Sequence, residues 1–263
     1  MFKPWRAAQA AAWVASLMAM HSAGATPSPP LTATESAWLN AALPVLVFSR
    51  QQGLPLDIVV QPQPTPGQSP LGMAFVDGRC KLVLSMRGNP QAQSTLDDIE
   101  PGLQGSVVEA IAAHELGHCW RHVSGTWGKL PDGISDLMSI ARLAPEHAEL
   151  LRDMWRTRRE EGFADLVGLA WTLTRNPGQY AEVHAWYVRL RADQTVDTGP
   201  HDTRVWVQFA QDRSRFGTGG AIFERVHALW VQGLLAGVLP AQPPTQDAAS
   251  RVQGSRALHG LED

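Results

Sequence analysis

The sequence has little net charge, few cysteines and no internal repeat. Its 22 Lys and Arg residues nearly balance its 25 Asp and Glu residues, which leaves a formal net charge of −3. Proteins that bind nucleic acid rely on clustered positive charge, so this balance argues against a nucleic-acid partner. With only two cysteines, the chain can form at most one internal disulfide bond.

Past its first residues the chain also lacks an apolar run of the roughly 20 residues that a membrane span needs. At the start, Lys3 and Arg6 precede an apolar run from Ala10 to Met20, and the small residues Ala23-Gly24-Ala25 follow. A positive flank, an apolar centre and small residues are typical of a cleavable secretory signal peptide. We therefore expect residues 1–25 to be a signal peptide, and the mature protein to be periplasmic or secreted without stable membrane insertion.

The most informative stretch runs from Ala112 to Trp120 and contains His-Glu-x-x-His as His114, Glu115 and His118. Its apolar neighbours predict a buried helix over 102–123. Positions four apart lie on one face of a helix, so the two histidines can bind one ion. Zinc lowers the pKa of a bound water toward about 7, and a carboxylate one step round the helix can take the proton. The chemistry indicated is hydrolysis of an amide.

A catalytic zinc needs a third protein ligand. A metzincin-type site is excluded because Arg121 and Ser124 stand where Gly and His are required. An aspzincin-like Gly-Thr-x-Asp run is excluded because Gly128 replaces its Asp. Glu161 and Asp165 are better candidates, since they lie four apart on a strongly helical segment. There Glu161 can complete the metal site while Asp165 hydrogen-bonds the far nitrogen of a ligand histidine.

Together, His-Glu-x-x-His at 114–118 and Glu-x-x-Ala-Asp at 161–165 resemble the motifs of the gluzincin metallopeptidases. The branch most similar to this chain contains the HtpX and CAAX-prenyl proteases and their small soluble relatives, the minigluzincins. The resemblance extends roughly from Asp77 to the helix after His201, although the membrane-embedded members carry transmembrane helices that this chain lacks. It implies a Zn2+ cofactor and these roles: zinc ligands His114, His118 and Glu161, general base Glu115, and orienting carboxylate Asp165.

A β-hairpin is predicted just before the metal-binding helix. The segments 73–76 and 79–85 flank Asp77-Gly78, a pair that favours a two-residue type I′ turn. Gluzincin-like enzymes hold the substrate backbone as an added strand on an edge strand at this point of the chain, which would supply main-chain hydrogen bonds. The alternative is a purely structural hairpin that covers the core.

Cys80 lies on the apolar face of this hairpin, and Cys119 directly follows a predicted ligand. In an exported protein, the two cysteines are expected to form one disulfide, which would join the hairpin to the metal-binding helix. The alternative is a pair of buried, unlinked thiols that pack as small apolar side chains.

A zinc peptidase also needs a donor for the oxyanion of its tetrahedral intermediate, usually His or Tyr. The related enzymes carry a His-Pro motif, followed by an Arg, at the point where this chain has His201. The match is partial, because Asp202 replaces the Pro and Arg204 comes early. His201 is the first choice, with a surface histidine that caps the next helix as the alternative. Tyr187 and Tyr180 are further options that also suit the core.

Two other sets of polar residues are expected to be structural. His122 extends the series from His118, but we expect a partly exposed histidine at the negative end of the helix dipole rather than a fourth ligand. The arginines before the acidic pair are expected on a solvated helix face, in salt bridges that include Glu160. They are Arg152, Arg156, Arg158 and Arg159.

The predicted fold class is α+β, a mostly helical zincin-like metallopeptidase domain over 26–240 with a small antiparallel sheet or hairpin before the metal-binding helix. Residues 241–263 are expected to form a loosely held tail. The ten Trp residues are expected to fill the core. A short strand is expected at 56–60, and helices are expected at 34–51, 102–123, 145–174, 180–191, 205–211 and 221–238.

The function predicted on these grounds is an exported zinc-dependent endopeptidase that acts on peptides or proteins. A second hypothesis keeps the zinc and the peptide cleft without turnover, as a binding or scaffold protein. A third is a helical domain without a metal.

Overall fold

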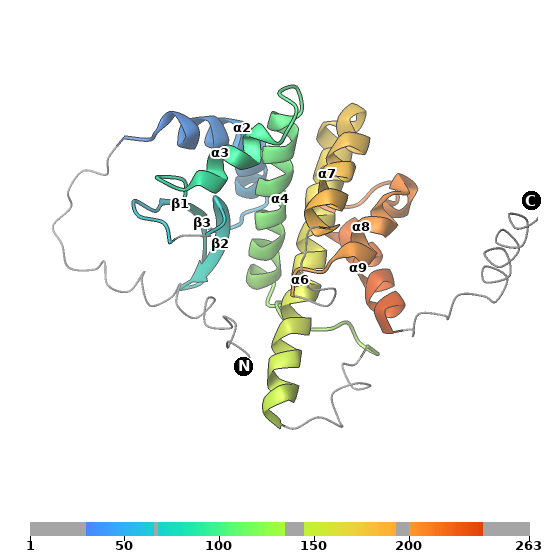
Figure 1. Cartoon of the computed structure of the whole chain (residues 1–263). Helices are drawn as coiled ribbons and strands as arrows, with labels where there is room; N and C mark the ends of the chain where they lie inside the picture. The colour runs from blue at the N-terminus through green and yellow to red at the C-terminus, as the bar shows by residue number, and fades with distance from the viewer. Residues whose placement is uncertain (1–29, 66–67, 135–144, 193–199, 239–263) are drawn as a thin grey trace, which may run out of the picture.

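The structure is a computed structural model that describes residues 30–65, 68–134, 145–192 and 200–238 (Figure 1). The predicted signal peptide, its cleavage point after residue 25 and the predicted tail at 241–263 lie outside these residues. Within them the chain is mostly helical with one small sheet, which confirms the predicted α+β class.

A tight turn at Asp77 and Gly78 joins strand β2 (Leu71–Val76) to strand β3 (Arg79–Leu84). Both turn residues have positive φ, 52° and 73°, as a type I′ turn requires, and the two strands pair antiparallel as predicted. Strand β1 (Leu56–Val60) pairs with β3 in parallel. The sheet is therefore mixed, with the order β1-β3-β2, and not wholly antiparallel as the sequence suggested.

The six helices predicted from apolar spacing are confirmed, and each begins and ends within two residues of its predicted bounds. They are α2 (Ala33–Gln51), α4 (Gln104–Val123), α6 (Pro145–Arg175), α7 (Tyr180–Ala192), α8 (Arg204–Ala210) and α9 (Ile222–Val238). A further helix, α3 (Pro90–Asp97), was not predicted, although Asn89 caps its start and Pro90 occupies its first turn. Among the described helices, none combines the length and apolarity that crossing a membrane would require.

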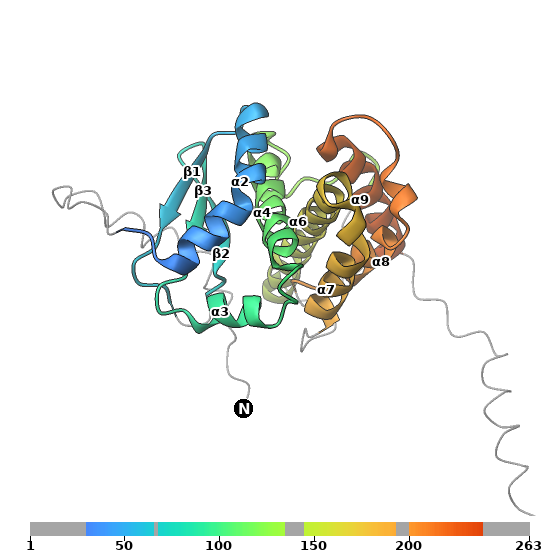
Figure 2. The ribbon, with the colours of Figure 1, turned by 90° about the horizontal axis from the view of Figure 1, so that it is seen from above.

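Helix α4 occupies the middle of the molecule. The sheet, α2 and α3 lie on one side of it, and α6, α7, α8 and α9 lie on the other (Figures 1 and 2). Its most extensive packing is against α6, followed by α2 and strand β2. Different faces of α4 therefore contact the two halves of the fold.

Gly117 allows α4 and α6 to approach closely between the two motif histidines. A Cβ atom at this position would lie 3.1 Å from the Cα atom of Ala164 and 3.1 Å from a methyl group of Val167. These distances are tighter than nine in ten real Cβ contacts, so a larger residue would require the neighbouring atoms of α6 to shift. The glycine thus helps to bring the two motifs together.

The disulfide bond predicted between Cys80 and Cys119 is present. The two Cα atoms are 5.6 Å apart, and both residues are fully buried. The bond joins β3 to α4 at the residue that follows His118. It therefore fixes the hairpin against the helix that carries the histidines.

The prediction that Trp residues fill the core is confirmed in part, since four of the eight described Trp residues are buried, namely Trp38, Trp171, Trp206 and Trp230. Trp206 and Trp230 are buried, and their indole N–H groups donate to the carbonyls of Trp230 and Arg159, respectively, at 2.9 and 2.8 Å.

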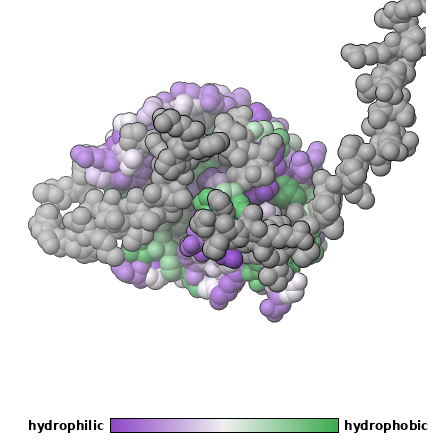
Figure 3. All heavy atoms as spheres, turned by 60° about the horizontal axis from the view of Figure 1, so that its bottom comes forward, coloured by the Kyte–Doolittle hydropathy of each residue, from purple (hydrophilic) through white to green (hydrophobic). Residues whose placement is uncertain are grey.

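Outside the core, large exposed apolar residues occur on several elements, including Leu43 and Val47 one turn apart on α2 and Val188 and Leu190 on α7. On the face shown in Figure 3, hydrophilic and hydrophobic residues are interspersed. Exposed apolar residues of this kind are ordinary on a protein surface.

Candidate metal centre

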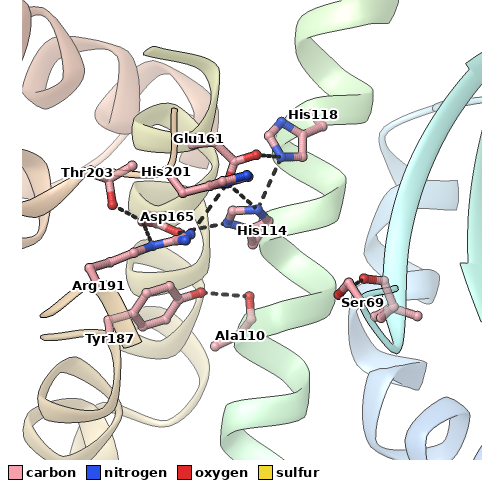
Figure 4. Close-up of polar contacts among 11 residues, drawn as sticks. Ser69, Ala110, His114, His118, Glu161, Asp165, Tyr187, Arg191, His201 and Thr203 are labelled. Carbon is pink, nitrogen blue, oxygen red and sulfur yellow. Dashed lines mark hydrogen bonds and ion pairs between the residues drawn. The ribbon is translucent and has the colours of Figure 1, made fainter. Parts of the chain in front are cut away.

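Three predicted ligands converge between α4 and α6 (Figure 4). The Nε2 atoms of His114 and His118 lie 3.1 Å apart. The carboxylate oxygens of Glu161 lie 3.6 Å from the first of these nitrogens and 3.5 Å from the second. The two histidines follow from their spacing on one helix, whereas Glu161 arrives from a helix more than 40 residues later in the chain.

These distances fit a group that shares one cation. Bonds of about 2.0–2.1 Å to a tetrahedral ion such as Zn2+ set its nitrogen and oxygen ligands about 3.3–3.4 Å apart. The three separations here, 3.1, 3.5 and 3.6 Å, fall on either side of that value. Two imidazole lone pairs at such a distance repel each other unless a proton or a cation lies between them. The residues present therefore fit a metal ion.

Asp165 orients His114. Its fully buried carboxylate lies 2.9 Å from His114 Nδ1, which places the proton on that nitrogen and leaves the lone pair of Nε2 directed at the site. The same carboxylate accepts hydrogen bonds from Arg191 at 2.8 and 2.6 Å and from Thr203 at 2.5 Å. Burial would raise the pKa of Asp165, but Arg191 and His114 lower it to about 2. The orienting carboxylate is therefore ionised at neutral pH.

The sequence did not indicate that Arg191 and Thr203 belong to this site. Arg191 lies in the last turn of α7, and besides binding Asp165 it approaches Glu161 to 3.5 Å. Its position in a helix of alternating charged and apolar residues carries no local signal of this contact. The same is true of Thr203, which precedes α8 without capping it through its side chain.

Electrostatics within the group favour an ionised Glu161. Burial would raise its pKa, but His118 and His201 hold it well below the usual value. The pKa of His118 is raised in turn, because the effect of Glu161 outweighs that of burial, which would lower it. Among the described residues, Nδ1 of His118 is buried without a hydrogen-bond partner. The orientation of this ring thus depends on its packing and on what its Nε2 binds.

Glu115, the predicted base, is buried beside the two histidines on α4. Burial raises the pKa of its carboxyl group, although His114 and His118 act in the opposite direction. A carboxylate in such surroundings is a stronger proton acceptor than one in water. This property suits the predicted role.

His201 lies at the edge of the group. Its Nδ1 is 3.3 Å from a Glu161 oxygen, its side chain is 49% exposed, and Glu161 raises its pKa. The adjacent Asp202 is buried and receives Nη2 of Arg158 at 2.9 Å and Nε of Arg204 at 2.8 Å. These contacts fix the backbone beside His201. Arg204, a predicted substrate-binding residue, forms an ion pair with Asp202.

The two tyrosines lie in the helical frame. Tyr187 is buried and donates to the carbonyl of Ala110 on α4 at 3.2 Å, below the three ligands in Figure 4. Tyr180 donates to the carbonyl of Ala210 at 2.6 Å. Both hydroxyl groups donate to backbone carbonyls of helices, whereas the ring of His201 lies against Glu161.

Glu160 corrects one expectation. It is 1% exposed, rather than on a solvated face. Its carboxylate receives two hydrogen bonds of 2.8 Å from the buried side chain of Arg121 and one from the backbone N–H of Gly128. Helix α6 is enclosed at this point by α4 and the loop after it, so the charged pair is internal.

His122 is partly exposed in the last turn of α4 and lies outside the ligand group, as expected. The ring is stacked between Phe75 and Trp127, with centroid distances of 4.7 and 3.9 Å. Burial, with a contribution from nearby His118, lowers its pKa to about 4. His122 is therefore neutral at pH 7, so it does not act as a cation at the negative end of the helix dipole.

Searches against protein-family models, curated proteins and solved structures found no match. The gluzincin resemblance therefore remains a prediction from the two motifs. The geometry independently supports a narrower statement, namely that His114, His118 and Glu161 could bind a metal ion.

Proposed function

We propose that the protein is a zinc-dependent endopeptidase of the gluzincin type. The observation that supports this most is the convergence of His114, His118 and Glu161 at distances suited to one tetrahedral ion. Two imidazoles, one carboxylate and a buried glutamate beside them form a donor set typical of zinc hydrolases.

Each residue has a task in this proposal. When bound, zinc would polarise the scissile carbonyl and acidify a water molecule. Glu115 accepts the proton of that water on its carboxylate and later gives it to the leaving amine. Asp165 keeps the Nδ1 proton of His114 in place, so that Nε2 remains a ligand. His201, whose protonated form Glu161 stabilises by accepting its Nδ1–H, donates its Nε2–H to the developing oxyanion.

The substrate backbone is proposed to lie along β2. In the order β1-β3-β2 this strand is an edge, and it is the strand that packs most extensively against α4. An extended peptide added there would gain main-chain hydrogen bonds that do not depend on its side chains. Near the start of the strand, Ser69 already donates to the carbonyl of Leu71 at 2.7 Å (Figure 4), so a peptide would pair with the strand beyond this point.

We also propose that the protein is exported. The Cys80–Cys119 bond supports this, because disulfides persist mainly in oxidising compartments. The predicted signal peptide at 1–25 agrees with this location. N-terminal sequencing of protein recovered from a secreting host tests it, and a chain that starts at residue 1 in the cytoplasm would contradict it.

The test of the enzymatic proposal is digestion of a peptide library by the purified protein, with and without a zinc chelator. We expect chelator-sensitive cleavage, and at least about a 100-fold loss of kcat in Glu115→Gln with zinc retained, because proton transfer by a positioned group contributes at least this much. Glu109→Gln, on the same helix, is the control, since Glu109 bonds to Trp171 rather than to the site.

Cleavage at the wild-type rate by Glu115→Gln would refute the assigned base. A zinc-loaded wild-type protein that cleaves nothing would favour the zinc-containing binding or scaffold protein. A purified protein with no zinc would favour the helical domain without a metal.

A further inference from the structure

Three aromatic rings from three different elements form a continuous stack beside the metal-ligand group. Phe75 comes from β2, His122 from the last turn of α4, and Trp127 from the loop that follows. The planes of neighbouring rings are inclined by only 10° and 12°. We call Phe75, His122 and Trp127 the aromatic wall.

The aromatic wall connects the two places that a peptide substrate would touch. Its outer ring, Trp127, lies 5.5 Å from the ring of His118, a predicted zinc ligand, with an inclination of 69°. At the other end, Phe75 belongs to the edge strand β2 and lies opposite Cys80, whose disulfide fixes this part of the hairpin to α4. A side chain that projects from a peptide on β2 near the metal would therefore meet these rings.

Hydrogen bonds to Arg121 and Glu160 fix the loop that carries Trp127. The carbonyl of Arg121 accepts the N–H of Trp127 at 2.9 Å, and Nη2 of Arg121 donates to the carbonyl of Lys129 at 3.0 Å. Gly128 donates its N–H to Glu160 at 2.8 Å. Because the Arg121–Glu160 pair is buried, the indole is held in place before any ligand arrives.

The aromatic wall also has the surface chemistry of an apolar subsite. All three side chains are only partly buried, in contrast with fully buried core aromatics such as Phe163 and Trp230. The pKa of His122 is lowered to about 4, so the stack carries no charge at neutral pH. Partly exposed, rigid, uncharged rings gain most from contact with aromatic or large aliphatic groups.

We propose that Phe75, His122 and Trp127 form one wall of a subsite that receives a large apolar side chain of the substrate, next to the scissile bond. The inference rests on the proposed peptidase function and adds to it the class of residue preferred at the cleavage site. A charged or very small residue at that position would leave the rings exposed to water.

The test uses short synthetic peptides that are identical except for Phe, Leu, Ala or Asp on either side of the central bond. For the zinc-loaded wild-type protein, kcat/KM for Phe or Leu should exceed that for Ala by at least about tenfold at one of the two positions, the scale expected of an apolar pocket. Trp127→Ala should reduce that ratio about tenfold, and Trp127→Phe should largely preserve it. Phe209→Ala is the control, because Phe209 lies in α8 and packs with Arg215 instead.

A second readout does not depend on turnover. The Kd values of the same peptides are measured by calorimetry on Glu115→Gln protein, with and without Trp127→Ala. If the wild-type protein cleaves none of the peptides while the Kd preference for Phe is lost with Trp127→Ala, the peptidase proposal fails and the subsite stands. Phe75→Ala replaces Trp127→Ala in both readouts if circular dichroism shows that the latter does not fold. A preference that survives the substitution in both readouts, or no preference in the wild type, overturns the inference.

Discussion

At the scale of single residues, His122 shows how packing sets the charge of a side chain. Its burial between Phe75 and Trp127 lowers the pKa of the imidazole from 6.5 to about 4. A histidine that folds into such a position resists protonation, so the folded state binds fewer protons than the unfolded chain between these two values. The packing of His122 therefore makes the stability of the protein depend on pH.

The sign of this dependence follows from the lowered pKa. The contribution of His122 to stability is complete above pH 6.5, falls as the pH drops from 6.5 toward 4, and is constant below pH 4. In His122→Phe, which keeps a ring in the stack, this slope should be absent. Urea denaturation at a series of pH values measures the difference in unfolding free energy between the two proteins. A difference that stays constant from pH 7 to pH 4 would show that His122 titrates normally.

Some residues of the site could be predicted from the sequence, and others could not. His114 and His118 could be paired from their spacing, because positions four apart on a helix share a face whatever surrounds it. The approach of Asp165 to His114 agreed with the motif resemblance. Arg191 and Thr203 could not be found, since their contact with Asp165 depends on how α7 and the residues before α8 pack, which no local pattern encodes.

At the scale of elements, the middle of α6 is less exposed than its charges suggest. A run of arginines and acidic residues is typical of a solvated face, and Asp153 and Arg156 indeed form an exposed ion pair there. Glu160, one turn further along, is enclosed with Arg121 of α4, and the rings of Trp230 and Phe163 lie 4.6 and 5.3 Å from the guanidinium. The helix passes from surface to interior within about two turns.

Glu160→Gln should therefore destabilise the protein by about 3–5 kcal/mol, because it leaves the charge of Arg121 buried without its partner. Asp153→Asn, which removes an exposed ion pair from the same helix, should change stability by less than about 1 kcal/mol. Chemical denaturation of the two variants makes the comparison. Equal, small effects would mean that the pair of Glu160 and Arg121 contributes no more than a surface pair.

The elements themselves were largely predictable, because apolar spacing, caps and turn residues act locally. The hairpin at Asp77-Gly78 is an example, since its turn requires two residues that accept positive φ. The parallel pairing of β1 with β3 could not be predicted in this way. The direction of β1 relative to β3 depends on the path of the long connection at 61–70. The Pro- and Gln-rich sequence of this connection predicts a loop but does not predict its path.

At the scale of the whole molecule, α4 belongs to both halves of the fold. It bears two of the predicted ligands, the predicted base, one cysteine of the disulfide and one ring of the aromatic wall. The sheet side contributes the edge strand, and the helical side contributes the third ligand and the network around Asp165. The proposed chemistry therefore requires both halves to be docked on α4 at once.

The binding of one zinc ion by His114, His118 and Glu161 is measured by zinc titration of metal-free protein. Calorimetry gives the affinity, and elemental analysis of the product gives the zinc content. We expect one zinc per chain for the wild type and at least about tenfold weaker binding for Glu161→Gln, which loses a charged ligand. Glu149→Gln, an exposed position on the same helix, should bind zinc as the wild type does. Wild-type protein without a zinc site, or Glu161→Gln protein with unchanged affinity, would show that these three residues do not bind zinc together.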